Sequence, residues 1–360
     1  MKICLLGQFP PHIGGVSSHS YLLSQELIAR GDEVWVITYP HPHIKDCDGI
    51  QVQEAWAPPI KGLRGLFFFL SSFFKLMRMV RSQDLDLIHA HYILPPGLIA
   101  VLVGGLTRTP TAVTVHGSDL LIQGQRPPLK QVIRWVLERA DHVMVVSKAL
   151  KRKVLKLGIN PQKVILTSNA VDMNRFSPYN SPPSDLHLDP HKTTLLFVGN
   201  LVPQKGVKYL LEGKKILDDH LTHDGTGREY ELLIVGDGPL RKALERKVQE
   251  DDIKDVVFLG ERRDVEKIMP AVDLFVLPSI SEGFPISILE SLASGVPVVA
   301  TNVGGVVEIE SGSIVQLVEP GQPEALTQAI MQMEEYISQK VVKKRARETA
   351  RKYAQIKIPY

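Results

Sequence analysis

The chain has 360 residues, of which 44% are hydrophobic and 22% are charged, and its net charge is only +3. This length predicts two domains, and this composition excludes a disordered or fibrous chain. Its two cysteines are too few for a disulfide framework or a four-cysteine zinc cluster, so we expect a protein of a reducing compartment.

The small net charge hides an uneven distribution along the chain. Residues 1–180 carry +8, residues 181–339 carry −12 and residues 340–360 carry +7. Basic segments of this kind favour an anionic partner. No segment offers the ~20 apolar residues that cross a bilayer, and the N-terminus lacks a signal-peptide pattern. We therefore expect a cytoplasmic protein, or one that lies peripherally on the inner face of the cell membrane.

Short apolar runs rich in Val, Ile and Leu alternate with helical patterns along the first half. Such runs suit strands that are covered on both faces, as in a parallel sheet. A helical pattern over residues 16–30 follows the first run and ends at Gly31. The predicted strands are residues 2–6, 34–38, 85–89, 111–115, 142–146 and 164–166.

The second half repeats this alternation after a break. Residues 177–192 contain four prolines and have no periodicity, so we place the linker there. The predicted helices are residues 205–217, 239–249, 264–271 and 285–294. The predicted strands are residues 194–198, 232–235, 256–259, 274–277 and 298–300.

These repeated strand–helix units predict an α/β fold with two doubly wound, Rossmann-like parallel sheets. We place the first domain at residues 1–180 and the second at residues 190–339. Ligands of such sheets bind beyond the carboxyl ends of the strands. We therefore expect the functional site in a cleft between the two domains.

The most informative segment follows the predicted strand at residues 274–277. Glu282 and Gly283 lie in a loop, where the glycine lets the backbone approach a ligand closely. Pro285 suits the first turn of a helix, whose free N–H groups form an anion site. Eight helical residues span about 12 Å, so Glu282 and Glu290 are too far apart for the carboxylate pair of a retaining glycosidase. They suit two parts of one elongated ligand, or else a solvated loop and helix.

Together with their neighbours, these residues resemble a family 4 retaining glycosyltransferase of the GT-B fold. The family's carboxylate motif corresponds to residues 282–290, its small-Gly-x-Pro-Val-Val run to residues 294–299, and its double glycine to residues 304–305. The resemblance covers nearly the whole chain. It implies that Glu282 and the backbone at Gly283, Phe284 and Pro285 hold the donor sugar, and that Glu290 binds the ribose. It also implies that residues 340–360 form a helix that returns to the first domain.

A cationic loop precedes the predicted helix at residues 205–217. A lysine at a helix start is opposed by the dipole, so Lys205 favours an anion beside it over a merely solvated side chain. The segment is similar to the family's Gly-Arg…Lys-Gly motif, whose two cations hold the donor diphosphate. Lys205 matches the lysine, but Asn200 replaces the arginine and cannot form a charged fork. Arg262 or Arg263 is a candidate to compensate for the missing charge.

The first domain offers a second group of residues at strand ends. Gly14 and Gly15 follow the first strand, where a double glycine permits close approach to a phosphate or forms an ordinary turn. His116 follows the strand at residues 111–115, and its His-Gly-x-Asp context resembles the family's. The resemblance implies that Gly14 and Gly15 face the donor phosphate, that His116 faces the reacting sugar or the acceptor, and that His19 lies on the acceptor side. We assign the catalytic roles to His116, Lys205 and Glu282.

A bound metal is one solution to the charge of a departing diphosphate, and a cationic clamp is another. Asp84 and Asp86 fit the Asp-x-Asp pattern but lie at the start of a strand, away from ligand sites. His89 and His91 end a strand but have no carboxylate at useful spacing. We therefore expect no metal site, no cofactor and metal-independent transfer. The resemblance implies that the anomeric configuration is retained.

These observations predict transfer of a hexosyl or N-acetylhexosaminyl group from a nucleotide-diphosphate sugar to a lipid-linked, saccharide or small hydroxyl acceptor. A nucleotide-sugar 2-epimerase or hydrolase of the same fold is the alternative enzyme. A non-catalytic sugar-nucleotide-binding subunit is the other alternative, because of Asn200. A nucleic-acid partner is disfavoured by the acidic second half. The sequence leaves open the donor base, the sugar and the acceptor.

A helical pattern over residues 61–81 combines a basic face with a broad apolar surface. Lys61, Arg64, Lys75 and Arg78 fall within about 100° of one another on a helical projection. An interfacial helix on an anionic membrane has this form, and so has a core helix with a solvated edge. The family often uses this region to meet lipid-linked acceptors, so an anionic membrane is a candidate partner.

Overall fold

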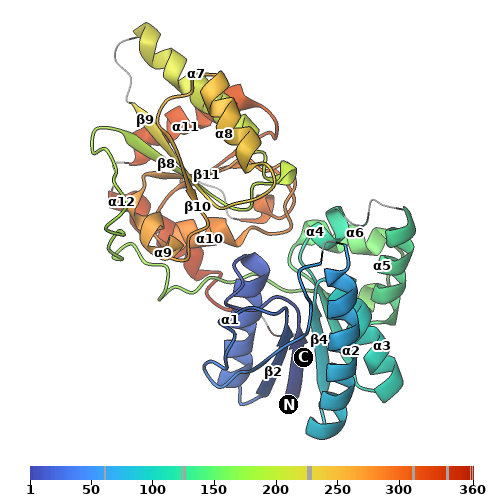
Figure 1. Ribbon diagram of the computed structural model, residues 1–360. Helices are drawn as coiled ribbons and strands as arrows, with labels where there is room; N and C mark the ends of the chain where they lie inside the picture. Colours follow the sequence, from blue (N-terminus) through green and yellow to red (C-terminus); the bar gives the residue numbers. More distant parts are fainter. Residues whose placement is uncertain are drawn as a thin grey trace. The chain divides into compact units, whose positions relative to one another are not determined.

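Two parallel β-sheets organise the chain into two structural units (Figure 1). The computed structural model describes residues 1–60, 62–122, 124, 127–224, 229–309, 313–337, 340–356, 358 and 360. The first unit comprises Met1–Ala170 and Gln355–Tyr360, and the second comprises Val171–Ala354.

The first unit is built on a seven-stranded sheet in the order β3-β2-β1-β4-β5-β6-β7, with every pair parallel. The strand order reverses between β1 and β4. Right-handed crossovers therefore put α1 on one face of the sheet and α2 and α3 on the other (Figure 1). The strands are β1 (Lys2–Leu6), β2 (Glu33–Thr38), β3 (Gln51–Glu54), β4 (Leu87–His91), β5 (Thr111–Val115), β6 (His142–Val145) and β7 (Val164–Leu166). The helices are α1 (Gly15–Ala29), α2 (Arg64–Gln83), α3 (Leu98–Thr107), α4 (Ser118–Leu121), α5 (Pro127–Arg139) and α6 (Lys148–Lys156), with short turns at Ile93–Gly97 and Pro161–Lys163.

The second unit is built on a six-stranded parallel sheet in the order β10-β9-β8-β11-β12-β13. Here the order reverses between β8 and β11. The strands are β8 (Thr193–Val198), β9 (Tyr230–Val235), β10 (Val256–Gly260), β11 (Leu274–Leu277), β12 (Val298–Thr301) and β13 (Val315–Val318). The helices are α7 (Val207–Asp224), α8 (Arg241–Glu250), α9 (Val265–Ile268), α10 (Ile286–Ala293), α11 (Pro323–Ile337) and α12 (Lys340–Arg351), with short turns at Pro203–Lys205, Met269–Ala271 and Val306–Glu308.

The end of the chain differs from the expectation for residues 340–360. Helix α12 belongs to the second unit, where Arg347 donates hydrogen bonds to the backbone oxygens of Ala293 (2.7 Å), Met173 (2.9 Å) and Phe176 (3.1 Å). Only Gln355–Tyr360 belong to the first unit, and Ile356 packs into its core. The expected return of the whole helix is therefore wrong, because α12 is anchored to the end of α10.

The division between the units also falls earlier than expected. It lies between residues 170 and 171, whereas the sequence placed it within residues 177–192. That proline-containing segment forms neither helix nor strand and belongs to the second unit. No helix in the described parts of the chain is both long and apolar enough to span a membrane.

Candidate functional site

The loops after β8 and β11 meet where the strand order of the second sheet reverses. The carboxyl ends of parallel strands lie at one edge, and a reversal of order opens a crevice there that suits ligands. Lys205 lies in the short turn Pro203–Lys205 after β8, and Glu282 lies in the loop between β11 and α10. The topology therefore brings together two residues that are 77 positions apart.

The side chains of Lys205 and Glu282 form a close ion pair. The Lys205 Nζ donates to Glu282 Oε1 at 2.6 Å, and Ser279 Oγ donates to the same oxygen at 2.6 Å. Glu282 is 9% exposed and Lys205 is 23% exposed. One carboxylate oxygen is thus held by protein donors, which orients the other. The sequence analysis did not single out Ser279, since a serine at a strand end carries no distinctive pattern.

Two glycines hold this loop by close backbone approach. Gly304 has a φ of +55°, and a Cβ there would lie 1.9 Å from the Glu282 carbonyl oxygen. Gly206 has a φ of +62°, and a Cβ there would lie 2.1 Å from the Pro278 carbonyl oxygen. The Gly305 amide also donates to the Gly283 oxygen at 3.0 Å. Any side chain at Gly304 or Gly206 would displace the backbone that carries Glu282.

Helix α10 begins directly after this loop. Pro285 is its N-cap in an extended conformation, and no side chain caps the first turn. The helix start therefore retains unpaired N–H groups and the positive end of its dipole. Pro285 itself has no N–H, so it can shape a donor site but cannot donate to a ligand. The Phe284 ring is buried and lies 5.8 Å from the Tyr353 ring, so it serves packing.

Glu290 lies in the second half of α10, eight residues after Glu282. No hydrogen bond or ion pair is described for its carboxylate among the residues that the structure covers. Burial raises its pKa to about 7, while the charge of Arg175 opposes this shift and that of Glu266 adds to it. An unpaired carboxyl group in such a setting suits ligand hydroxyls as partners.

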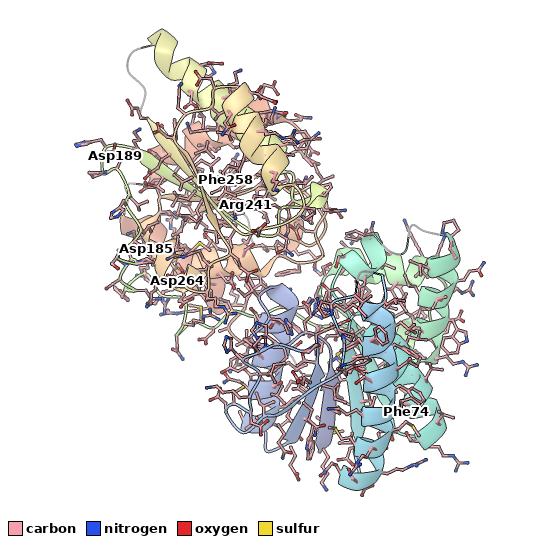
Figure 2. The ribbon with its side chains drawn as sticks, in the orientation of Figure 1. Phe74, Asp185, Asp189, Arg241, Phe258 and Asp264 are labelled. Atoms are coloured by element: carbon pink, nitrogen blue, oxygen red, sulfur yellow. The ribbon has the colours of Figure 1, made fainter. Side chains whose placement is uncertain are left out.

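Of the two arginines expected to compensate for Asn200, Arg262 is already engaged elsewhere. The Asn200 side chain itself is exposed. Arg262 instead pairs with Asp185 (2.6 Å) and Asp264 (2.7 Å), two of the residues labelled in Figure 2. Because two carboxylates already neutralise Arg262, the expected compensation by this arginine is not supported.

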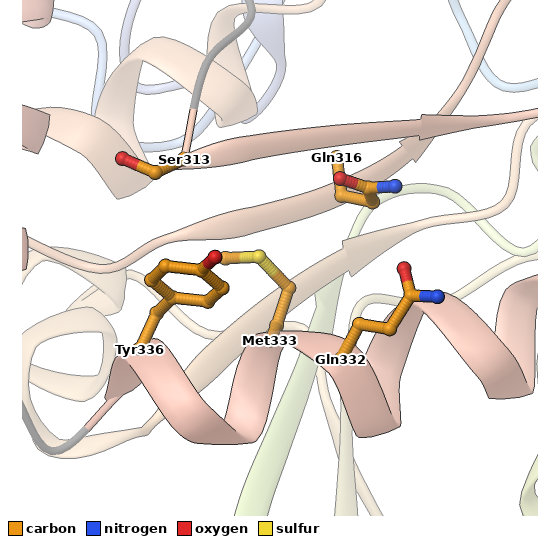
Figure 3. Close-up of a pocket in the computed structure, with 5 residues that line it drawn as sticks. All are labelled: Ser313, Gln316, Gln332, Met333 and Tyr336. Carbon is orange, nitrogen blue, oxygen red and sulfur yellow. The ribbon is translucent and has the colours of Figure 1, made fainter.

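One pocket of the second unit lies away from Lys205 and Glu282. This pocket of about 240 Å³ lies between β13 and α11 (Figure 3). Its walls are Ser313, Gln316, Gln332, Met333 and Tyr336. None of these residues lies at the carboxyl edge where Lys205 and Glu282 meet.

In the first unit, the double glycine Gly14–Gly15 lies at the carboxyl edge of the sheet, beside the reversal of strand order between β1 and β4. Gly14 has a φ of +141° and is the N-cap of α1, and no atom lies within 4 Å of a Cβ built on it. The glycine is therefore required by backbone conformation rather than by crowding. Gly15 opens the helix, whose first turn has no side-chain cap.

Three histidines come together beside this helix start. His19 lies in α1, His91 ends β4, and His116 follows β5. His91 Nδ1 and His116 Nε2 share a hydrogen bond of 3.2 Å, and the His19 ring lies 5.4 Å and 5.0 Å from these two rings. The sequence analysis selected His19 and His116 but treated His91 separately, because it could not tell that all three side chains converge.

Burial controls the charge of this histidine cluster. It lowers the pKa of His19 to about 4, against the opposing effect of a hydrogen bond with Asn169. It also holds the pKa values of His91 and His116 well below the ordinary value, and the neighbouring histidines add to the shift. All three rings are therefore neutral at neutral pH.

Two further side chains contact this cluster: His89 stacks on His91, and Asp119 is hydrogen-bonded to the His116 amide. His89 is hydrogen-bonded to Thr114 (2.7 Å) and to the Tyr360 hydroxyl (2.9 Å), and its ring stacks on His91. Asp119 accepts from the backbone amides of Gly117 (2.9 Å) and Leu120 (3.0 Å), which fixes the loop after His116. Sequence reasoning found the Asp119 position only as part of the His-Gly-x-Asp motif.

Comparison with known proteins decides which family these two units represent. Residues 13–175 match the family model described as Glycosyltransferase Family 4, and residues 192–335 match the one described as Glycosyl transferases group 1. The chain belongs to glycosyltransferase family 4. Its two parallel-sheet units form the GT-B fold, as the sequence predicted.

Two relatives illustrate the range of this glycosyltransferase family. The chain is 28% identical to the N-acetyl-alpha-D-glucosaminyl L-malate synthase of Bacillus anthracis, covering 94% of this chain and 90% of that one. It is 29% identical to a UDP-Gal:alpha-D-GlcNAc-diphosphoundecaprenol alpha-1,3-galactosyltransferase of Escherichia coli, covering 66% and 62%.

Solved glycosyltransferase structures share the fold of this chain. The sucrose-phosphate synthase of Thermosynechococcus elongatus aligns with a TM-score of 0.81 and 22% identity, covering 98% of this chain and 95% of that one. Anabaena HepE, solved in complex with UDP-glucose, aligns with a TM-score of 0.77 and 20% identity, covering 99% and 96%.

Proposed function

We propose that this glycosyltransferase moves a hexosyl or N-acetylhexosaminyl group from a nucleotide-diphosphate sugar to a hydroxyl acceptor, with retention of anomeric configuration. The observation that carries the proposal is the Lys205–Glu282 ion pair beside the uncapped start of α10. It puts a cation, a helix dipole and an oriented carboxylate at one end of a sheet, where a sugar diphosphate needs all three.

The donor site uses the two glutamates for different parts of the ligand. The oxygen of Glu282 that Lys205 and Ser279 leave available accepts hydrogen bonds from sugar hydroxyls. Lys205 and the first amides of α10 hold the diphosphate. Glu290, whose carboxylate has no described partner, accepts the ribose hydroxyls. The HepE complex with UDP-glucose supports a nucleotide sugar as the donor class.

During transfer, negative charge builds up on the departing diphosphate and has to be stabilised. The bond between the anomeric carbon and the diphosphate oxygen breaks, and its electron pair stays on the diphosphate. Lys205 and the dipole of α10 stabilise that charge. The acceptor oxygen attacks the same face, and its proton passes to the departing diphosphate.

We propose that this step requires no divalent metal and no cofactor. The one Asp-x-Asp pattern noted in the sequence supports this, since Asp84 and Asp86 precede β4 at the amino edge of its sheet, where Asp86 accepts the Lys2 amide at 2.7 Å. His116, together with the amides at Gly14 and Gly15, faces the donor or the acceptor from the first unit, and His19 lies on the acceptor side.

The acceptor is proposed to be lipid-linked, because α2 exposes an apolar stripe at four-residue spacing. Leu66, Leu70 and Phe74 are 52%, 44% and 67% exposed, and Arg78 continues the stripe (Figure 2 labels Phe74). A hollow of about 560 Å³ beside it is lined by Phe73, Phe74, Met77, Arg78, Arg81 and Ser82. Apolar side chains flanked by arginines suit an anionic lipid surface.

The basic face that the sequence predicted for this helix is only partly available. Arg64 lies over the Tyr39 ring, and Lys75 donates to the Glu54 carbonyl oxygen at 2.7 Å. Both cations are thus engaged within the first unit, and Lys61 lies outside the described residues. Arg78 and Arg81 remain as the exposed cations of the stripe.

The donor site is tested by thermal stabilisation with a panel of sugar nucleotides. We expect one nucleotide sugar to stabilise the protein, and Glu282→Ala to lose transfer while keeping its fold. Transfer that persists in Glu282→Ala would contradict the assigned site. Turnover of the nucleotide sugar without any acceptor would instead favour an epimerase or hydrolase, and stabilisation without turnover would favour a binding subunit.

A further inference from the structure

The histidine cluster of the first unit has the composition of a metal site. His19, His91 and His116 each offer one ring nitrogen, and these nitrogens all lie within 4.8 Å of one another. They come from three separate elements, α1, β4 and the loop after β5, that converge at one edge of the sheet. His19 and His91 are each 1% exposed, whereas His116 is partly exposed and provides the route of entry.

We propose that these three histidines bind a divalent transition metal such as Zn²⁺, and that the bound ion inhibits the enzyme. The inhibitory part rests on the proposed function, in which His116 faces the donor or the acceptor. The binding part does not, because it concerns only the geometry of the first unit.

The spacing of the nitrogens suits a small, tetrahedral ion. Zinc binds imidazole nitrogen at about 2.1 Å, which sets two nitrogen ligands about 3.4 Å apart in a tetrahedral site. His91 Nδ1 and His116 Nε2 already lie 3.2 Å apart. The His19 nitrogen lies within 4.8 Å of the other two, so this ring has to move closer to complete the site. Three imidazoles leave a fourth position for water or a substrate oxygen.

The chemistry of the cluster selects against the hard cations. Neutral imidazole is a good ligand for Zn²⁺, Ni²⁺ and Cu²⁺, whereas Mg²⁺ and Ca²⁺ prefer oxygen ligands.

A second observation points to an absent ligand. The Nδ1 of His19, the third ring of the cluster, is buried and has no hydrogen-bond partner in the described part of the chain. Buried polar atoms are almost always paired, and a polar cluster that is only partly satisfied costs stability. The surrounding groups already resemble a supporting shell, since Asn169 is hydrogen-bonded to His19 and Asp119 fixes the backbone at His116.

Inhibition follows from the position of His116. A bound ion takes the place of the hydrogen bond between His91 and His116, whose proton moves to the other nitrogen of its ring or to solvent, and the ion occupies the ring nitrogen of His116. It also adds positive charge where a neutral ring had been. His116 can then no longer contact the sugar or the acceptor in its neutral form.

Metal binding is tested first without any substrate. Chelator-treated protein is titrated with Co²⁺, whose tetrahedral complexes absorb strongly in the visible range, and then with Zn²⁺. We expect one ion per chain, and loss of affinity by more than about tenfold in His19→Ala and in His116→Asn. The control is the double variant His41→Ala/His43→Ala, which removes the other nearby histidine pair and should bind as the wild type does.

X-ray absorption at the zinc edge of the wild-type protein makes the test independent of variant folding. Three imidazole ligands are expected. Fewer than three imidazoles, any sulfur ligand, or loss of binding in the His41→Ala/His43→Ala control would overturn the metal site. If the site binds zinc and zinc fails to inhibit transfer, the inhibitory part is overturned, whereas an inactive but zinc-binding chain would refute the proposed function alone.

Discussion

At the residue scale, the exchange of the family's arginine for Asn200 is the clearest departure from pattern. The exchange could be predicted from the sequence, because Asn200 stands at the arginine position of a motif that follows a predicted strand. Whether another cation replaces the arginine was not readable, because ion pairs such as those of Arg262 with Asp185 and Asp264 join positions that are distant in sequence. Ser279 was missed because a serine at a strand end carries no distinctive pattern. The convergence of His91 with His19 and His116 was missed because these residues are distant in the sequence.

Restoring the arginine should strengthen donor binding. In Asn200→Arg we expect the dissociation constant of the nucleotide sugar to fall by up to about tenfold, since one added charged contact is worth about 1.4 kcal/mol. The effect should weaken as salt is raised. Titration calorimetry measures it, with Asn200→Gln as the uncharged control. Unchanged affinity in Asn200→Arg would place the diphosphate elsewhere.

The raised pKa of Glu290, about 7, predicts a pH dependence of donor binding. An ionised carboxylate accepts two ribose hydroxyls better than a protonated one, so affinity should rise between pH 6 and pH 8. Binding titrations at several pH values check this, and Glu290→Gln should bind weakly with a flat profile. A wild-type profile as flat as that of the variant would contradict the assignment.

Ionisation of Glu290 should strengthen donor binding, but it should lower the free energy of unfolding. Because the folded pKa lies above the unfolded value, the folded state holds more protons between about pH 4.5 and pH 7. The contribution of Glu290 to the free energy of unfolding therefore decreases as pH rises through this window. Nucleotide binding and stability respond to this carboxyl group in opposite directions.

At the element scale, apolar patterning predicted the strands that carry continuous apolar runs and missed two of the four edge strands. β1, β5, β7 and β11 have the predicted bounds, because buried parallel strands form continuous apolar runs. β3 and β13 were missed. Residues 51–54 read Gln-Val-Gln-Glu, and β13 is only partly buried, so neither edge strand carries such a run.

The loop that carries Glu282 depends on Gly304. In Gly304→Ala the added Cβ would lie 1.9 Å from the Glu282 carbonyl oxygen, in a backbone conformation that disfavours alanine. We expect kcat/KM to fall by at least about 100-fold, comparable to losing one stabilising donor. Gly105→Ala is the control, because it lies in α3 with no atom near its Cβ and should retain activity. Full activity in Gly304→Ala would show that the loop geometry is dispensable.

The exposed stripe on α2 predicts membrane binding. We expect wild-type protein to sediment with vesicles that contain anionic lipid, with binding that weakens as salt is raised. Phe74→Glu should reduce this binding by several-fold without changing the thermal midpoint, since Phe74 is 67% exposed. Met331→Glu, at an exposed helical position in the second unit (42%), should bind normally. Equal sedimentation of both variants would exclude α2 as the contact.

At the scale of the whole molecule, the net charge of +3 is a cancellation between the units. If residues 340–360 had returned to the first domain, the two halves would carry +15 and −12. The observed division gives the first unit +9 and the second −6, because α12 brings its basic residues to the second unit. The asymmetry is smaller than predicted and keeps its sign. The basic unit carries the exposed stripe on α2 that we propose as a membrane contact, and the acidic unit carries Lys205 and the start of α10, which we propose as the local site for an anionic ligand.

We propose retaining, metal-independent transfer from a nucleotide sugar at the Lys205–Glu282 site. The anomeric configuration of the product tests this most directly, followed by NMR from the first minutes of the reaction in the presence of a chelator. We expect the donor's configuration in the product at an undiminished rate, and none of this product in Glu282→Ala. An inverted product, or a rate that collapses with the chelator and returns with a divalent metal, would contradict it.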